Sequence, residues 1–541
     1  MSADFDVIVV GSGPSGAHAA QAAVASGAKV AVVDVGHVDH HYVDIVPDRP
    51  FSEIRRDDAE QRRYFLGERL EGVAARAGAA GAQLTPPRKF IVHEADERLP
   101  FRSSTMRPMQ SLALGGLGAG WGAGCATYDQ RELQRAGLPT EGFGRYYDVV
   151  AAAIGVSGTT EDDVSPDVAA LRHLQPPLDL DSNASAIMRT YARRRGPLQA
   201  RGFRLGRLPM AVLTAPLGDR LPNPYHDMDF WSDHRASVYR PAYTIRRLQG
   251  EPQFAYLDHQ LAERFVEEDG AVTLLTRDLS TDTGRLFRCR RLILAAGAIN
   301  TARVALRSLG AYDTRVPMLC NPYTYMPFMN LPMLGRPARD RRHSLAQLTA
   351  IYTPPGAPDE RLVANLFSYR SLLLFKLVAE MPLPPRLGLL AARLMATSLT
   401  IAGIHHPDEP SPLRYVELKR RGASGDEIVA ECGWSAEEER TRHRRERRLA
   451  RHFMTLRCLP LSVVRPAHGA SLHYAGTLPY ADDDRPLTCT PEGRLRGTRS
   501  VYVADASPWR YLPAKGLTLT LMAGARRVGE LVAEGVRRDR T

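Results

Sequence analysis

The sequence predicts an α/β fold in which one domain is assembled from separated segments of the chain. Three observations predict it: a strand, glycine turn and helix at the N-terminus, a buried strand that ends in small residues near residue 296, and a strand followed by a long helix at the C-terminus. Apolar runs of this length are typical of buried parallel strands. The 541 residues suffice for more than one domain.

The first segment predicts a βαβ unit. Residues 6–10 form a β-branched apolar run, a glycine-rich turn at 11–16 follows, and residues 17–26 are rich in alanine. A second apolar run at 29–33 ends at Asp34. This order of strand, turn, helix, strand and acid is the fingerprint of a dinucleotide site.

Each residue of the turn has a physical reason in that site. Gly11 permits the tight turn, Gly13 lets a pyrophosphate approach the backbone beside Ser15, and Gly16 lets the helix pack on the strand. Asp34 would accept hydrogen bonds from ribose hydroxyls. At this step FAD and NAD both remain possible.

A second glycine cluster, at 112–124, predicts backbone that lies against a cofactor. Interior glycine costs about 1 kcal/mol relative to alanine in a helix, so a stable helix is excluded. The leucines and the tryptophan within the cluster argue against a flexible surface loop. The predicted contacts are Gly115, Gly116, Ala119, Gly120, Trp121 and Gly122.

Two later segments return to the nucleotide domain. Residues 254–287 predict hairpins, and residues 291–297 predict a buried strand before a helix that begins near Thr301. Residues 500–504 predict another strand, and 518–534 a long amphipathic helix. The cofactor contacts predicted here are Ala296, Gly297, Asp505, Ala506, Leu517 and Thr518.

Composition excludes several classes of protein. The formal net charge is +11, but the arginines are spread along the chain, which argues against nucleic-acid binding. Six separated cysteines argue against a disulfide framework and a zinc site, and no stretch predicts an integral membrane segment. His405 and His406 point to opposite faces of a strand, so we expect no metal. Without an export signal, cytoplasm is the predicted location.

Together, these motifs resemble, over nearly the whole chain, the glucose–methanol–choline (GMC) family of FAD-dependent oxidoreductases, and the glycine cluster is most similar to its pyranose-oxidase and sugar-dehydrogenase branch. The resemblance implies FAD, a discontinuous Rossmann-like FAD-binding domain and an α+β substrate domain built on an antiparallel sheet. In pyranose oxidases a histidine before the tryptophan is tethered to the flavin; Gly120 stands there, so we expect non-covalent FAD.

The resemblance also implies the catalytic residues. His473, followed by Gly476 and Thr477, matches the family's catalytic base, and imidazole suits proton removal near neutral pH. The family's second catalytic residue falls at Gly516, which has no side chain. The neighbouring Lys515 is the predicted substitute donor.

The predicted FAD-binding domain comprises residues 1–165, 235–310 and 465–541, and the substrate domain comprises 166–234 and 311–464. The predicted function is oxidation of an alcohol on a carbohydrate-like or polyol substrate, by hydride transfer to flavin N5 with His473 as base. Oxygen or another acceptor would take the electrons, and the oligomeric state is left open.

Alternatives remain. Gly516 also suits a flavin-containing lyase or isomerase, and the apolar stretch at 371–404 suits an apolar natural-product alcohol or a membrane surface. A scaffold without catalysis is disfavoured because His473 and the nucleotide motifs are both present.

Overall fold

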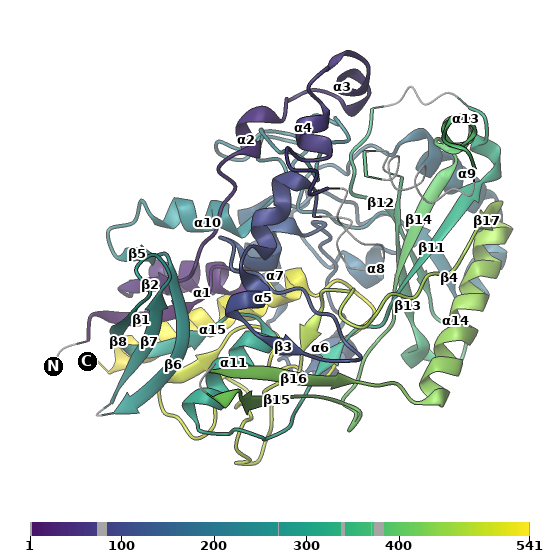
Figure 1. Cartoon of the computed structure of the whole chain (residues 1–541). Helices are drawn as coiled ribbons and strands as arrows, with labels where there is room; N and C mark the ends of the chain where they lie inside the picture. The colour runs from purple at the N-terminus through teal and green to yellow at the C-terminus, as the bar shows by residue number, and fades with distance from the viewer. Residues whose placement is uncertain are drawn as a thin grey trace.

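The computed structural model describes residues 3–72, 84–268, 270–336, 341–368, 371–372, 383–422 and 425–539. Figure 1 shows two sheets at opposite ends of the molecule, with both chain termini beside the nucleotide sheet. Within these residues no helix is both long and apolar enough to cross a membrane. Part of the apolar stretch predicted at 371–404 lies outside the described residues.

The nucleotide sheet has the order β5-β2-β1-β8-β7-β6, with β19 paired to β8. Strands β5, β2, β1, β8 and β19 pair in parallel, whereas β6, β7 and β8 pair antiparallel, which confirms the predicted hairpins. The strands are β1 (Phe5–Val10), β2 (Val30–Val33), β5 (Phe254–Leu257), β6 (Gln260–Glu268), β7 (Ala271–Asp278), β8 (Thr283–Leu294) and β19 (Val501–Val503).

Helices cover this sheet. α1 (Pro14–Ala25), α10 (Pro241–Leu248) and α15 (Thr518–Arg538) share one apolar core with it, to which Val7, Ala20 and Val528 belong. α11 (Ala298–Ser308) starts a few residues before the predicted position. The α/β fold expected from the sequence is therefore present, and its nucleotide sheet joins segments nearly 500 residues apart in the chain, from β1 to β19.

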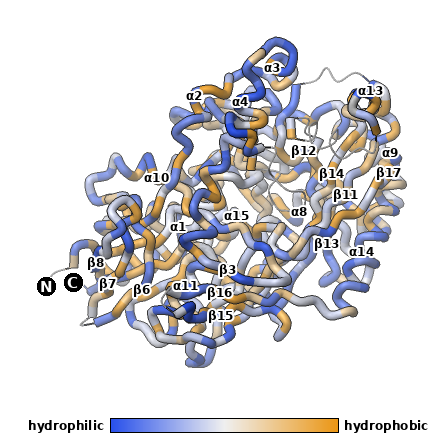
Figure 2. The backbone as a smooth tube through the Cα atoms, viewed as in Figure 1, coloured by the Kyte–Doolittle hydropathy of each residue, from blue (hydrophilic) through white to orange (hydrophobic). Residues whose placement is uncertain are grey.

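The second sheet is antiparallel, in the order β17-β11-β14-β13-β12-β4. Its strands are β4 (Phe203–Gly206), β11 (Tyr323–Asn330), β12 (Ala346–Tyr352), β13 (Leu362–Phe367), β14 (Leu399–His405) and β17 (Cys458–Pro460). Helices α9 (Ser182–Gln199) and α14 (Ala436–Thr455) pack on one face of it. Figure 2 shows how hydrophilic α14 is along its length.

Two small sheets lie beside the two large ones. One has the order β3-β16-β15-β9, with β3 (Phe101–Arg102), β9 (Val316–Pro317), β15 (Arg414–Arg420) and β16 (Asp426–Cys432). The other pairs β10 (Leu319–Cys320) with β18 (Tyr474–Ala475). The β10–β18 pair brings the segment around residue 473 next to the antiparallel sheet. The domain boundaries expected from the sequence stay a prediction.

Candidate active site

One cavity of about 340 Å³ is lined by residues of both large sheets, within the roughly 300–1,000 Å³ of small-molecule sites. It extends from the carboxyl ends of β1 and β2 to the open face of the antiparallel sheet. Most of the predicted site residues line it: Gly11, Gly13, Ser15, Asp34, Gly116, Trp121, Gly122, Ala296, Gly297, His473, Asp505, Ala506, Gly516, Leu517 and Thr518. Those set back from it are Gly16, Gly115, Ala119, Gly120 and Lys515.

The glycine turn leaves room for a phosphate at the start of α1. Gly11 has a φ of 97°, in the left-handed region that favours glycine. A Cβ at Gly16 would lie 1.8 Å from the Gly11 carbonyl oxygen, so the turn packs tightly against α1. A Cβ at Gly13 would meet nothing closer than 3.9 Å. The first backbone N–H groups of α1 are thus accessible to an anion.

Asp34 directly follows β2, and its side chain belongs to a hydrogen-bond network that the sequence did not reveal. Its carboxylate accepts hydrogen bonds from the Ser12 hydroxyl and, at 3.1 Å, from the Tyr256 hydroxyl. The Ser12 Oγ also accepts the Gly115 N–H at 2.8 Å, which joins the turn to the glycine cluster. Burial raises the pKa of Asp34 to about 7. Ribose hydroxyls that donate to this carboxylate would stabilise its charged form.

The glycine cluster contributes to the cavity wall, and its middle part, Gly116–Gly120, forms a short 3-10 helix, although the sequence predicted that the segment is not a stable helix. A Cβ at Gly120 would lie 2.8 Å from Ile91 Cδ1, so this glycine faces the protein interior. Trp121 lines the cavity and donates its indole N–H to the Tyr239 carbonyl at 2.7 Å. The indole is therefore held in one orientation, beside or behind the space predicted for a ring system.

A second carboxylate lies where β19 ends. Asp505 accepts hydrogen bonds from the Thr301 hydroxyl and from the Ser507 N–H at 2.9 Å, and burial raises its pKa. It lies beside the start of α11, where Gly297 precedes the helix. Asp34 and Asp505 thus mark two points along the nucleotide part of the cavity.

The imidazole of His473 lies within hydrogen-bonding distance of the Asn321 side chain. The His473 Nδ1 lies 3.0 Å from the Asn321 Oδ1. The Asn321 Nδ2 donates to the carbonyls of His406 and Pro513, at 2.7 and 3.1 Å, which fixes the amide with its oxygen toward the imidazole. His473 therefore carries its proton on Nδ1 and keeps the lone pair on Nε2. Burial lowers the pKa of His473 to about 4, so the ring is neutral at pH 7.

In the sequence, His405 is notable only as a possible metal ligand, whereas the structure places its ring in the cavity. Its ring stacks on His473 with centroids 4.8 Å apart and an interplanar angle of 13°, and both rings line the cavity. Burial and the neighbouring His473 hold the pKa of His405 well below its usual value. The next residue, His406, points the other way, with Nε2 3.4 Å from Glu446 Oε1. The expected opposite orientation of these two histidines is confirmed.

The structure places Lys515 outside the lining of the cavity, although the sequence predicted it as a donor there. Its side chain is fully buried, and its ammonium donates to Glu132 Oε2 at 2.5 Å, to the Asp167 carbonyl at 2.6 Å and to the Thr127 carbonyl at 3.2 Å. Three acceptors therefore hold it away from the cavity. Gly516 does line the cavity, and a Cβ there would meet only the Gly124 carbonyl at 3.7 Å.

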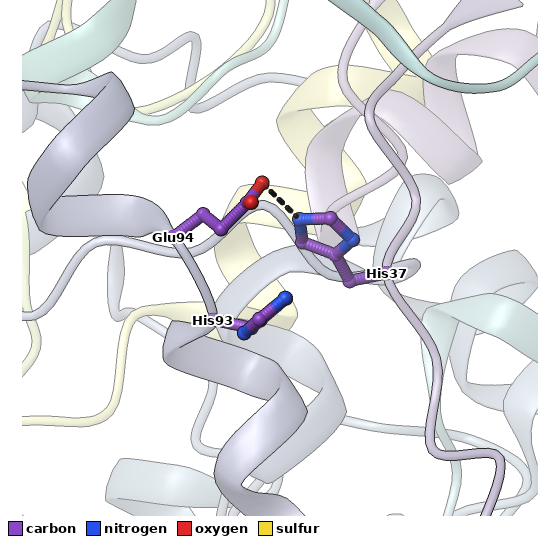
Figure 3. A group of neighbouring side chains, drawn as sticks. All are labelled: His37, His93 and Glu94. Carbon is purple, nitrogen blue, oxygen red and sulfur yellow. Dashed lines mark ion pairs between the residues drawn. The ribbon is translucent and has the colours of Figure 1, made fainter. Parts of the chain in front are cut away.

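A separate cluster of possible metal ligands lies outside the lining of this cavity (Figure 3). His37 Nε2 is 3.6 Å from a Glu94 carboxylate oxygen, and the His37 and His93 rings meet edge to face at 4.9 Å. One donor atom from each residue lies within 4.8 Å of the other two. The absence of a metal stays a prediction, and this cluster is where it can be tested.

Comparison with known proteins shows the fold of the chain. No family model and no curated protein matches the sequence. Among solved structures, a pyridoxine 4-oxidase from Mesorbium loti matches with a TM-score of 0.58 and 14% identity, over 99% of this chain and 99% of that one. The chain therefore shares the fold of a known oxidase along its whole length. This comparison does not support the pyranose-oxidase branch.

Proposed function

We propose that the chain is an FAD-dependent oxidoreductase that oxidises the CH–OH group of a small molecule, as in the GMC family. The observation that carries the proposal is that His473, with Nδ1 3.0 Å from Asn321 Oδ1, lines the same cavity as the dinucleotide turn. The residues fit the cofactor: the space above Gly13 suits a pyrophosphate, and the buried carboxylate of Asp34 suits ribose hydroxyls. The fold shared with an oxidase adds to this argument.

Each residue has a separate task in the proposed reaction. Bound FAD supplies a two-electron acceptor. His473 takes the hydroxyl proton at Nε2 as the carbinol C–H bond breaks. The Asn321 oxygen accepts the Nδ1–H of His473, which leaves the lone pair on His473 Nε2. The same hydrogen bond stabilises the imidazolium that forms when Nε2 takes the proton. When His473 is protonated, His405 stays neutral, because two positively charged rings with centroids 4.8 Å apart would repel each other.

Several finer points belong to the same proposal. FAD is held without a covalent bond, and oxygen or another acceptor reoxidises it. We expect acid precipitation to release yellow flavin into the supernatant. Flavin that stays in the protein pellet would contradict the non-covalent assignment. The carbohydrate or polyol substrate expected from the sequence stays a prediction.

The central test is anaerobic mixing of the FAD-loaded protein with sugars, polyols, aliphatic alcohols and aromatic alcohols. Loss of the oxidised flavin absorbance with at least one alcohol is expected. His473→Ala should keep its FAD and lose this reaction, whereas the exposed His40→Ala is the matched control. Flavin that no alcohol bleaches would remove the proposal.

A flavin-containing lyase or isomerase is the second candidate, because Gly516 gives the cavity no side chain at the position of the family's second catalytic residue. The same mixing experiment separates the two functions. A lyase or isomerase would convert a substrate while the flavin absorbance stays unchanged.

A further inference from the structure

The cavity end formed by the antiparallel sheet has an aromatic lining. Tyr323, Tyr325, Phe367 and His405, here called the aromatic wall, all line the cavity. Tyr323 pairs with His405 across β11 and β14, and Tyr325 pairs with Gly403, so their side chains share one face of the sheet. Phe367 joins this face because β13 pairs Phe367 with Ile401 of β14.

The rings of the wall lie close together. The Tyr323 centroid is 4.6 Å from that of His405 and 4.7 Å from that of Tyr325. A Cβ at Gly403 would lie 2.0 Å from the Tyr323 hydroxyl oxygen and 3.5 Å from Phe367 Cε2. Glycine at this position therefore lets both rings lie over the strand. His473 stacks on His405 and places the proposed base beside the wall.

The wall carries no charge. Among the described residues that line the cavity, the charged side chains are Asp34, Asp505 and Arg303, all on elements of the nucleotide sheet and its helices. His405 and His473 are neutral at pH 7, because burial lowers the pKa of each. The amide of Asn365 already accepts the Thr349 hydroxyl at 3.0 Å. The other polar atoms at this end are uncharged: they include the Tyr323 and Tyr325 hydroxyls and the His405 Nδ1, and they can pair with a polar substituent on a ring that stacks against the wall.

We propose that this end of the cavity binds a flat, uncharged aromatic or heteroaromatic ring, so that the substrate is an aryl-methanol rather than a sugar or polyol. Rings of the wall would make edge-to-face and offset-stacked contacts with it. A charged ring substituent would be excluded, because burial without a partner charge is strongly unfavourable. That the bound ring is a substrate rests on the proposed function. Binding of the ring itself can be tested without turnover.

The test uses three unreactive ligands of similar size and titrates each into the FAD-loaded protein by calorimetry: benzamide, cyclohexanecarboxamide and benzoate. Benzamide and cyclohexanecarboxamide differ in ring flatness, and benzamide and benzoate differ in charge. We expect benzamide to bind about tenfold more tightly than either of the others. Equal affinity for the two amides, or no binding of benzamide, would overturn the inference.

Variants of the wall assign the preference to its rings. Tyr323→Leu and Phe367→Leu should each reduce the preference for benzamide over cyclohexanecarboxamide, while the matched Tyr415→Leu, on β15 and outside the cavity lining, should keep it. A preference that survives in both wall variants would place the ring elsewhere and contradict the inference. FAD absorbance of each variant checks that the fold is intact.

Turnover then separates this inference from the proposed function. Anaerobic bleaching by benzyl alcohol, with glucose and glycerol inert, supports both. Bleaching by sugars alone would keep the oxidoreductase and overturn the aromatic substrate. If no alcohol bleaches the flavin, the proposed function fails, and the benzamide titration still decides whether the wall binds a flat ring.

Discussion

The two ends of the cavity are built in different ways. At the nucleotide end, the turn at 11–16 and Asp34 come from one short stretch of chain, and much of the binding surface is backbone. At the other end, Tyr323, Phe367, His405 and His473 come from strands and a loop up to 150 residues apart. A backbone site can be written as a local motif, whereas a side-chain site depends on sheet register. Substitutions at the two ends should therefore have separate effects.

The largest effect is expected from His473→Ala. Loss of the base should slow flavin reduction by about 10²–10⁴-fold, the usual contribution of general-base catalysis, with bound FAD unchanged. Stopped-flow absorbance measures the rate, and His40→Ala serves as the exposed control. An unchanged rate would show that His473 is not the base.

Asp34→Ala should affect only the nucleotide end. Loss of the charged acceptor for the ribose is worth about 1.5–3 kcal/mol, or roughly a 10- to 150-fold weaker FAD affinity. Fluorescence titration of the apoprotein with FAD measures the Kd, and the exposed Asp44→Ala is the control. At saturating FAD the reduction rate should match wild type. A wild-type Kd would place the ribose away from Asp34.

Lys515→Met tests whether neighbouring residues in the chain belong to different parts of the structure. Its loss leaves the Thr127 and Asp167 carbonyls without their donor, and Glu132 keeps Arg361 at 3.1 Å. We expect a loss of roughly 1–3 kcal/mol in the free energy of unfolding, measured with denaturant. The flavin reduction rate should not change. A slower reduction in folded protein would return Lys515 to the active site.

The smallest change is in pH alone. Burial raises the pKa of Asp34 to about 7, so protonation below that pH should weaken FAD affinity. Burial lowers the pKa of His473 to about 4, so the base is deprotonated above that pH and the reduction rate falls only below it. Titration of the Kd and of the reduction rate from pH 3 to 9 should show two separate midpoints. One shared midpoint would contradict the assignment of FAD affinity to Asp34 and of the reduction rate to His473.

Residue order alone determined the βαβ part of the nucleotide end. The sequence placed Gly11, Gly13 and Asp34 along the cavity because a βαβ unit closes within about 30 residues and its geometry is fixed by local backbone rules. His473 was found in the same way, from a motif that matches a known family. The same family resemblance, counted back from Ala523 in the final helix, led to Gly516, which lines the cavity.

Tertiary structure decided the rest, and the physical reason is that long-range pairing sets which side chains meet. Asn321 contacts His473 through the β10–β18 pair, and His405 faces His473 because the register of β14 directs residues 403 and 405 to one face. The path after residue 514 turns Lys515 into the protein interior and leaves Gly516 at the cavity. A shift of one residue in the register of β14 would turn His405 away from His473. No local pattern in the sequence encodes that register.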